Sequence, residues 1–468
     1  MKKLKLMLAV MFAIAVGNAS AQQLKPFKAG DRVAFVGNSI TDGGHYHSYI
    51  WLYYMTRFPE MRVWMGNLGI GGDTSAEILN RIEGDAYAKL PTVLALTFGM
   101  NDSGYQELNS DTAATFANHR VDFARNNYEK IEKHLLNHPE ARVIQIGTSP
   151  YDQNSKIKNT WLWKGKNDVI KRIIDLQRSS AKRNGWEFFD FNEPMVALNT
   201  LIQQRDSAEF TICGHDRIHP DNDGHMYMAY LFLKAQGMGG KKVADMQINA
   251  KKKVATLTDN CSISNISGDK TSLSFDYLAK SLPYPLDTIA RGAMEWKRPQ
   301  CLVLKYVPDF MKEMNDENLT VTGLKGTFEL KIDNEVIDTL SAEDLAKGVN
   351  LATYVNTPQY KQALRVMDLN EDRWDMERRV RDWAWVEFDY FLKNGVKDFN
   401  TDAAVKMYNH DKQNNWWLAS RRDIFFKMRN PGVREACEKY QQTVVDEIYR
   451  VNKPVSHHIS INRLQHNK

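Results

Sequence analysis

Between residues 31 and 240, short apolar runs rich in β-branched side chains alternate with longer segments that have helical periodicity. This alternation is typical of a parallel β-sheet with crossover helices, because each connection between parallel strands must run back along the sheet. Strands that are covered on both faces read as continuous apolar runs. The pattern predicts a three-layer α/β sandwich with five strands, at residues 32–36, 62–66, 92–98, 142–147 and 186–189.

Helix signals occupy the segments between these strands. Thr74 and Glu77 have the spacing of a capping box, in which two residues satisfy each other's backbone N–H groups, so a helix should begin there and run toward Arg81. Helical periodicity also covers residues 112–136, 166–183 and 223–236. The last of these ends at a Gly-Met-Gly-Gly stretch (237–240), which we interpret as a linker.

The sequence changes character after residue 240. Apolar residues alternate with polar ones at Leu273, Phe275 and Tyr277, which predicts strands within 243–277, and further strands are predicted within 319–340. Residues 357–394 and 401–451 are predicted to be helical, and we interpret their tryptophans as core residues: Trp374, Trp383, Trp385, Trp416 and Trp417. The predicted units are a signal peptide (1–21), an α/β domain (22–240), a small β module (241–350) and a mainly helical region (351–468).

The N-terminal residues have the three parts of a secretory signal. Lys2, Lys3 and Lys5 precede an apolar run at 6–16, and Ala-Ser-Ala at 19–21 is a small-residue cleavage site. The apolar run is short for a membrane span, so an uncleaved anchor is the weaker alternative. No cysteine follows the cleavage site to carry a lipid. We therefore expect a secreted or periplasmic protein that is not a lipoprotein.

Charge and cysteine content exclude several classes of protein. The formal net charge of +5 falls to nearly neutral once the three N-terminal lysines are removed. A nucleic-acid-binding surface needs clustered Lys and Arg, so we expect no nucleic-acid partner. The four cysteines lie far apart without C-x-x-C spacing, which excludes a zinc knuckle and a thioredoxin-like site. Export would permit disulfides, but the spacing assigns no pairs.

Candidate catalytic residues follow three of the predicted strands. Gly-Asn-Ser at 37–39 places Ser39 where the first strand ends, and open α/β sheets bind ligands at the carboxyl ends of their strands. A glycine-rich run at 67–74 follows the second strand, and Gly-Met-Asn-Asp at 99–102 follows the third. Further on, Asp216 precedes His219 by three residues, a separation that lets one turn of chain bring both side chains into contact.

These blocks, taken as a set and in this order, resemble the SGNH or GDSL-type hydrolase family, whose hallmark residues fall on Ser39, Gly72, Asn101 and His219. The resemblance covers residues 31 to about 240 and implies a flavodoxin-like fold and ester hydrolysis without a metal or organic cofactor. The G-x-S-x-G elbow of ordinary α/β-hydrolases is absent. One position departs from the family pattern, because the usual Gly-Asp-Ser is Gly-Asn-Ser here, with the uncharged Asn38.

The chemistry explains why these residue types are needed. A serine hydroxyl is a poor nucleophile until a base accepts its proton, and His219 would do so with one ring nitrogen while the other donates to Asp216. Negative charge then builds on the substrate carbonyl oxygen. The resemblance assigns its stabilisation to the backbone amides of Ser39 and Gly72 and to the side chain of Asn101. Taken singly, each residue also has an ordinary structural role, as a turn, a cap or a packed histidine.

Other residues near these blocks have weaker signals. His45 and His47 form an H-x-H motif, but no carboxylate or cysteine completes a zinc site. Residues 221–224 lack the acidic alternation and terminal glutamate of a calcium loop. We expect substrate-facing roles for four residues near the site, namely Asn38, His45, Tyr151 and Trp161. Aromatic rings there would form an apolar wall or stack on a sugar, and packing beneath a loop is the alternative.

The sequence therefore predicts a serine esterase that removes a small acyl group, with acetyl as the first expectation, from a carbohydrate or glycan through an acyl-enzyme intermediate. Export and the large C-terminal region favour a glycan, and residues 241–468 would cover or extend the substrate cleft. A lipid acylhydrolase or lysophospholipase is the second hypothesis, although no amphipathic lid accompanies Ser39. A non-catalytic glycan-binding protein, with Asn38 marking a degenerate site, is the third. The oligomeric state stays open.

Overall fold

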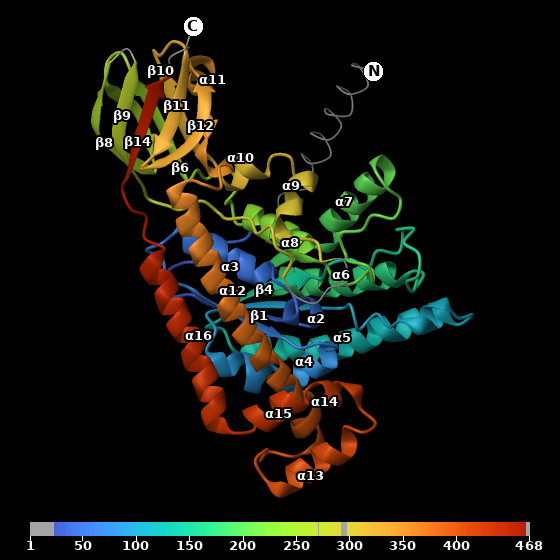
Figure 1. The fold of residues 1–468 in the computed structure, drawn as a ribbon. Helices are drawn as coiled ribbons and strands as arrows, with labels where there is room; N and C mark the ends of the chain where they lie inside the picture. Colours follow the sequence, from blue (N-terminus) through green and yellow to red (C-terminus); the bar gives the residue numbers. More distant parts are fainter. Residues whose placement is uncertain (1–22, 270, 292–296, 465–468) are drawn as a thin grey trace.

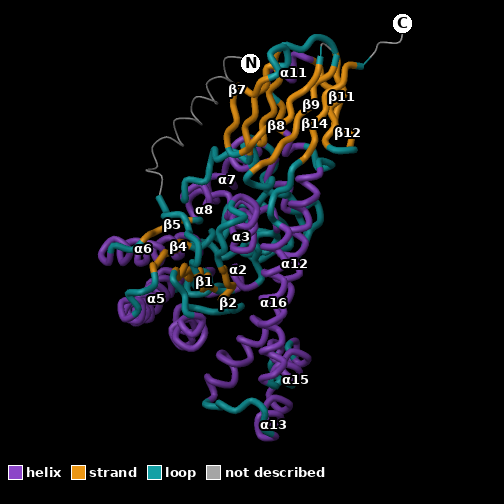
Figure 2. Tube along the Cα trace, turned by 90° about the vertical axis from the view of Figure 1, so that its left-hand side faces the viewer, coloured by secondary structure: helices purple, strands orange, loops and turns teal. Residues whose placement is uncertain are grey.

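The computed structural model describes residues 23–269, 271–291 and 297–464, so the predicted signal peptide lies outside the described residues. An α/β unit forms the middle of the molecule, a β module lies at one end and a small helical tip at the other (Figure 1). Figure 2 shows the same order from the side, with α13 and α15 far from the strands of the β module. In this described part of the chain, no helix combines the length and the apolar character that a membrane span requires.

Five parallel strands form the sheet of the α/β unit, in the order β2-β1-β3-β4-β5. They are β1 (Arg32–Gly37), β2 (Trp64–Gly69), β3 (Val93–Phe98), β4 (Arg142–Gly147) and β5 (Glu187–Asp190). This is the strand order of flavodoxin-like folds, whose ligands bind at the carboxyl edge of the sheet. The structure thus confirms the predicted three-layer α/β sandwich.

Helices cover both faces of this sheet. Strand residues alternate between two apolar cores because successive side chains of a strand point to opposite faces. One core includes α3 (Tyr46–Arg57), α7 (Asn192–Arg205) and α8 (Asn222–Ala235). The other includes α4 (Ser75–Arg81), α5 (Ala113–Asn137) and α6 (Lys166–Asn184). The capping box of Thr74 and Glu77 at the start of α4 is present as predicted.

The second strand lies further along the chain than predicted. Asn67 and Gly69 pair with Phe35 and Gly37 of β1, so they belong to β2 and the loop begins only at Ile70. Glycine and asparagine are poor strand formers, which is why the pattern ended the strand early. Backbone pairing with β1 overrides that local preference. The corrected strand boundary affects the description of the site, because Asn67 is a buried residue of β2 and does not belong to the loop.

The β module contains two sheets, of orders β13-β10-β6-β7 and β12-β11-β14-β9-β8, that share one apolar core. Its strands are β6 (Ala244–Asn249), β7 (Val254–Asp259), β8 (Cys261–Gly268), β9 (Ser272–Ala279), β10 (Glu317–Thr322), β11 (Thr327–Ile332), β12 (Glu335–Ser341), β13 (Val349–Asn350) and β14 (His457–Arg463). Helix α11 (Ala342–Lys347) accompanies them. Strand β14 comes from the end of the chain and lies between β11 and β9. The region predicted as mainly helical therefore also completes the β module.

The segment between β9 and β10 leaves the β module and packs on the α/β unit. It contains α9 (Val303–Tyr306) and α10 (Phe310–Met314). The Leu282 amide donates to Thr56 O at 2.8 Å, and the Tyr284 hydroxyl donates to Tyr49 O at 2.8 Å. Since Thr56 and Tyr49 lie on α3, this segment joins the two units.

A long helical pair runs along the α/β unit (Figure 1). It consists of α12 (Pro358–Ala384), followed by a π-helical turn at Trp385–Phe391, and α16 (Pro431–Val451). The helical tip between them contains α13 (Asp402–Asp411), α14 (Trp416–Ser420) and α15 (Arg422–Met428). Trp374 and Trp383 are buried as predicted, but Trp416 and Trp417 are 71% and 42% exposed, so their interpretation as core residues was wrong. The neighbouring Leu418 fills the core of the tip instead.

All four cysteines are free thiols, so the structure contains no disulfide among them.

Glu317 of β10 is a buried carboxyl group where the β module meets the rest of the chain. The Tyr277 hydroxyl and the Gln359 amide donate to its Oε1 atom at 2.8 and 3.0 Å. Burial raises the pKa of Glu317 from its ordinary value of 4.5 to about 7, although these hydrogen bonds and Arg57 oppose the shift. The folded protein therefore holds this proton more tightly than the unfolded chain. The resulting stabilisation is complete below pH 4.5 and is lost as the pH rises through about 7.

We expect Glu317→Gln to raise the free energy of unfolding at pH 8 by about 1–3 kcal/mol relative to wild type, and to change it little at pH 5. Glutamine keeps the accepting oxygen but carries no charge to bury. Thermal and urea unfolding at both pH values would measure the difference. Glu343→Gln, at an exposed glutamate of α11, is the matched control. Equal effects of Glu317→Gln at the two pH values would contradict the titration of this group.

Candidate active site

Ser39 lies at the carboxyl edge of the central sheet. It is the first residue of the short helix α2 (Ser39–Asp42), which begins directly after β1. The helix starts here because the Asn38 side chain caps it, with Oδ1 accepting a hydrogen bond from the Ile40 amide at 3.1 Å. Ser39 is partly exposed, whereas its neighbours on both sides are buried. Its hydroxyl is thus held at the rim of the sheet.

His219 and Asp216 come together with Ser39. The distance between His219 Nε2 and Ser39 Oγ is 2.7 Å, and that between His219 Nδ1 and Asp216 Oδ2 is 2.5 Å. The other carboxylate oxygen of Asp216 accepts the backbone amides of Ile218 and His219, both at 2.9 Å. Burial alone would raise the pKa of Asp216, but the bonds from His219 and these amides outweigh it and lower the pKa. The carboxylate is therefore ionised beside the imidazole.

The loop that carries Asp216 and His219 is anchored by Arg217. This residue has a left-handed backbone conformation (φ +70°), and its buried guanidinium donates to the carbonyl oxygens of Asp152 and Ser155 at 2.9 Å. The anchor fixes the turn against the loop that follows β4. The role of Arg217 could not be predicted from the sequence, because its partners lie more than 60 residues away in the chain.

Two backbone amides at the rim have no partner. Within the described residues, no hydrogen bond is donated by the backbone N–H of Ser39 or by that of Gly72. Gly72 is exposed, has φ +92°, and faces open space on the side where a Cβ atom would lie. Only glycine adopts this conformation without strain. Two backbone donors therefore stay available at this edge of the sheet.

Asn101 is held so that its amide nitrogen remains a donor. Its Nδ2 donates one hydrogen to Asp73 O at 2.8 Å, which leaves a second N–H, and the Tyr105 hydroxyl donates to its Oδ1. These bonds fix the orientation of the side-chain amide, since each end of the group has the partner it requires. Asp73 follows Gly72 directly, so the bond also connects two of the sequence blocks.

A buried lysine supports Tyr105. Lys166 Nζ lies 3.8 Å from the centre of the Tyr105 ring and donates to Met100 O and Ser103 Oγ, both at 2.7 Å. Burial lowers the pKa of Lys166 well below its usual range. Neither Tyr105 nor Lys166 was identified from the sequence. A tyrosine four residues after Asn101 was the one available signal, and nothing in the sequence indicates which way its hydroxyl points.

Asp102 connects the loop after β3 to the start of α4. Its buried carboxyl group accepts the Ser75 amide at 2.8 Å and the Gly99 amide at 3.0 Å. These bonds fasten the start of α4 to the loop after β3. The structure therefore brings together all five residues predicted as catalytic or oxyanion-binding at one edge of the sheet.

Three residues predicted to face the substrate do not do so. His45 is 1% exposed, stacks on Trp374 with ring centres 3.8 Å apart, and lies 3.2 Å from a Glu371 carboxylate oxygen. Tyr151 is also 1% exposed, and its hydroxyl donates to Trp161 O at 2.9 Å. Asn38 is 1% exposed as the cap of α2. These are packing residues, which corrects the prediction, whereas Trp161 is 77% exposed and its role stays a prediction.

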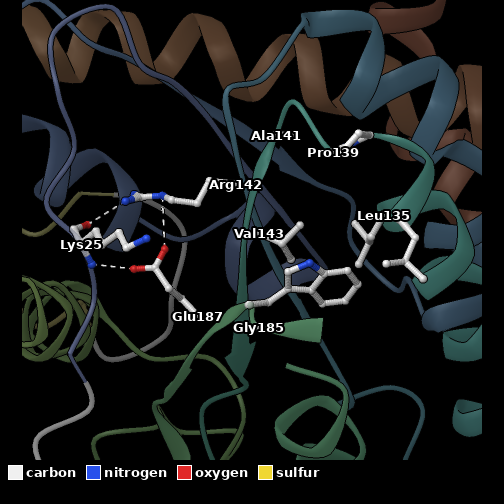
Figure 3. Close-up of a pocket in the computed structure, with 10 residues that line it drawn as sticks. Lys25, Leu135, Pro139, Ala141, Arg142, Val143, Gly185 and Glu187 are labelled. Carbon is white, nitrogen blue, oxygen red and sulfur yellow. Dashed lines mark hydrogen bonds and ion pairs between the residues drawn. The ribbon is translucent and has the colours of Figure 1, made fainter. Parts of the chain in front are cut away.

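A cavity of about 280 Å³ lies at the opposite edge of the sheet (Figure 3). Arg142 and Glu187, at the amino ends of β4 and β5, form one wall together with Lys25. Their polar groups are paired, because the Lys25 amide donates to Glu187 Oε1 at 2.5 Å and Arg142 Nε lies 3.3 Å from Glu187 Oε2. Apolar side chains that include Val143 form the other wall. The cavity is therefore separate from the Ser39 site.

Known proteins resemble this chain in sequence and structure. The GDSL-like lipase/acylhydrolase family model matches residues 35–227, and the model of the diltiazem deacetylase C-terminal helical domain matches residues 364–453. A solved gut microbial diltiazem-metabolizing enzyme is 52% identical, with a TM-score of 0.93, over 95% of this chain and 100% of that one. An acetylxylan esterase from Geobacillus stearothermophilus is 25% identical over 229 residues, which are 45% of this chain and 95% of that protein.

The fold and these similarities define a hydrolase that acts on ester bonds. More particularly, the chain belongs to the GDSL-like lipase/acylhydrolase family, the SGNH hydrolases, and carries an additional C-terminal helical region.

Proposed function

We propose that this protein is a serine esterase that removes acetyl or another small acyl group from a hydroxyl group through an acyl-enzyme intermediate. The observation that carries the proposal is the contact series in which Ser39 Oγ lies 2.7 Å from His219 Nε2 and His219 Nδ1 lies 2.5 Å from Asp216 Oδ2. A nucleophile bonded to a base, which is in turn oriented by a carboxylate, is the arrangement that activates serine.

In the proposed mechanism, His219 accepts the hydroxyl proton while Ser39 Oγ attacks the ester carbonyl. Charge on the carbonyl oxygen is stabilised by the free amides of Ser39 and Gly72 and by the second N–H of Asn101. The protonated His219 then donates its proton to the departing alcohol. A water molecule, activated by the same imidazole, attacks the acyl-enzyme and releases the acid. Asp216 stays ionised and stabilises the imidazolium throughout.

The proposed substrate is an acetyl ester on a carbohydrate, a glycan or another ring-bearing small molecule. One relative and one domain model support the acetyl group, since the relative is named an acetylxylan esterase and the matching helical domain is named for a diltiazem deacetylase. The proposed location is outside the cytoplasm, after removal of residues 1–21. We further propose that residues 22–240 form the catalytic unit. Residues 241–468 are then part of the same functional enzyme.

A series of nitrophenyl esters tests the acyl preference. We expect kcat/KM to fall at least about tenfold from acetate to octanoate, because a pocket that fits a small acyl group excludes a long one. Rapid acid quenching followed by intact-mass measurement should reveal a fraction of enzyme heavier by one acetyl group. Equal activity on long chains would favour the lipid acylhydrolase hypothesis. If no ester were hydrolysed, the hypothesis of a non-catalytic binding protein would remain.

A further inference from the structure

The proposed oxyanion donor Gly72 belongs to the segment at residues 69–72, which consists of the last residue of β2 and the first three residues of the loop after it and is named the oxyanion loop below. Three of its four residues are glycines, and glycine has more backbone freedom than any other residue. An oxyanion donor must nevertheless lie about 2.7–3.1 Å from the position that the oxyanion will occupy. A loop of this composition therefore needs contacts from residues outside the loop to hold its backbone in place.

Helix α12, from the C-terminal helical region, supplies part of that support. Arg381 Nε donates to Gly69 O at 2.9 Å, and the Glu377 carboxylate accepts the amide of Asn67, two residues earlier, at 3.0 Å. More than 300 residues of sequence separate the partners in both bonds. The side chains of Arg381 and Glu377 are almost completely buried. The start of the oxyanion loop is thus bonded to a helix outside the α/β unit.

The middle of the oxyanion loop is held through Asp42. The Gly71 amide donates to Asp42 Oδ2 at 3.1 Å, and Arg378 of α12 pairs with the other carboxylate oxygen of Asp42 and donates to its backbone oxygen at 2.8 Å. Asp42 is the last residue of α2, whose first residue is Ser39. Arg378 therefore bonds to the helix that carries the nucleophile, and through Asp42 to the oxyanion loop.

A buried charge network supports the end of the loop. Arg81 Nε lies 2.7 Å from Asp73 Oδ2, and its Nη1 lies 2.5 Å from Asp85 Oδ2. The same Asp85 carboxylate accepts two bonds from Arg381, at 2.8 and 2.6 Å. All four side chains are at most 5% exposed. Asp73 follows Gly72, so α12 is connected to both ends of the oxyanion loop.

We propose that Arg378 and Arg381 are positioning residues for the oxyanion loop, and that the C-terminal helical region is in this way a working part of the active site. The inference rests on the proposed function, because it concerns the donors of that mechanism. Donors that stabilise charge only in the transition state affect kcat, whereas uniform binding contacts affect KM. Loss of a positioning residue should therefore appear in kcat.

Arg378 offers the sharper test because its side chain is 24% exposed, so its replacement leaves no fully buried gap. We expect Arg378→Gln to lower kcat for nitrophenyl acetate about tenfold and to leave KM within about twofold. Arg378→Lys, which keeps the charge without the planar fork, should recover part of the loss. Arg365→Gln is the matched control, since Arg365 lies on the same helix with an exposed pair to Glu447. That control should have wild-type kinetics.

Asp42→Asn provides an independent second variant. It keeps an oxygen for the Gly71 amide but removes the charge that Arg378 binds, so the same fall in kcat is expected. The double variant Asp42→Asn/Arg378→Gln should be no worse than the poorer single variant, because both remove one interaction. Each rate is divided by the number of serine sites that a fluorophosphonate labels to completion, so that loss of folded enzyme does not imitate a slower reaction.

Unchanged kcat per labelled site in Arg378→Gln and Asp42→Asn would overturn the inference, as would a rise in KM at constant kcat. A fall in kcat of the double variant equal to the product of the two single falls would also contradict the inference, because the two residues would then act independently. Failure of the proposed function looks different. In that case Ser39→Ala would leave the hydrolysis rate unchanged, whereas failure of the positioning inference alone leaves the Ser39 dependence intact.

Discussion

Ser39→Ala is expected to lower kcat on nitrophenyl acetate by about 10⁴–10⁶-fold, the range found when a serine triad loses one of its members. The reason is that the bond from Ser39 Oγ to His219 Nε2, at 2.7 Å, is the proposed route by which the hydroxyl loses its proton. Steady-state kinetics and intact-mass detection of the acyl-enzyme would measure the effect. The acetylated species should disappear entirely.

Three companion variants make this result specific. His219→Ala should be about as slow as Ser39→Ala, and the double variant no slower, because triad residues act as a unit. Ser110→Ala is the control, since Ser110 is an exposed serine whose hydroxyl donates to a loop carbonyl, that of Glu107. Its kinetics should match wild type. Hydrolysis by Ser39→Ala at a tenth of the wild-type rate or faster would contradict the proposed mechanism.

Asn101→Ala should lower kcat by about 10²–10³-fold while KM changes little, as found when one oxyanion donor is removed. One N–H of Asn101 donates to Asp73 O at 2.8 Å, and within the described residues the second N–H has no hydrogen-bond acceptor, so it is available for the oxyanion. Asn101→Asp should be at least as slow, since it replaces a donor by a negatively charged acceptor. Steady-state kinetics on the acetate ester measures both variants.

The control for this pair is Asn109→Ala, whose exposed side chain bonds to the backbone of Leu162 and Lys164. That variant should retain wild-type kcat. If Asn101→Ala raised KM and left kcat unchanged, Asn101 would be a ground-state binding residue, and the oxyanion assignment would be wrong.

The arrangement of the site could be predicted because its residues follow strand ends. Ser39 and Asn101 each come within three residues of a buried parallel strand, and such strands end at one edge of a sheet. Asp216 and His219 are local neighbours, so their contact needed only one turn of chain. Pattern and topology therefore predicted that these residues lie at one edge of the sheet, whereas the oxyanion role of Asn101 was implied by the resemblance to the SGNH family.

Residues that support the site could not be predicted, because their contacts are distant in sequence. Arg381 meets Gly69 O from 312 residues away, and Lys166 meets Met100 O from 66 residues away. Nothing in the local sequence separates these buried charges from ordinary surface charges. Only the packed structure shows that they have partners.

Side-chain direction accounts for the wrong predictions. His45 and Tyr151 lie near the expected loops, but tertiary packing turns both inward, His45 against Trp374 and Glu371. The prediction for Trp416 and Trp417 was wrong in the opposite sense. The five-residue helix that carries them buries Leu418, leaves Trp416 mostly exposed and leaves Trp417 partly exposed beside Trp385. Residue type predicts how much a side chain gains from burial, and the neighbours decide whether burial occurs.

Strand β14 closes one sheet of the β module from a distant part of the sequence. It pairs with β9 on one side and with β11 on the other, although both of these strands lie much earlier in the chain. Without β14, that sheet would have a gap and two unpaired edges, and unpaired edges invite association between chains. A truncation before residue 457 should therefore expose both edges. This seven-residue strand thus makes completion of the second core depend on residues that lie beyond the helical region.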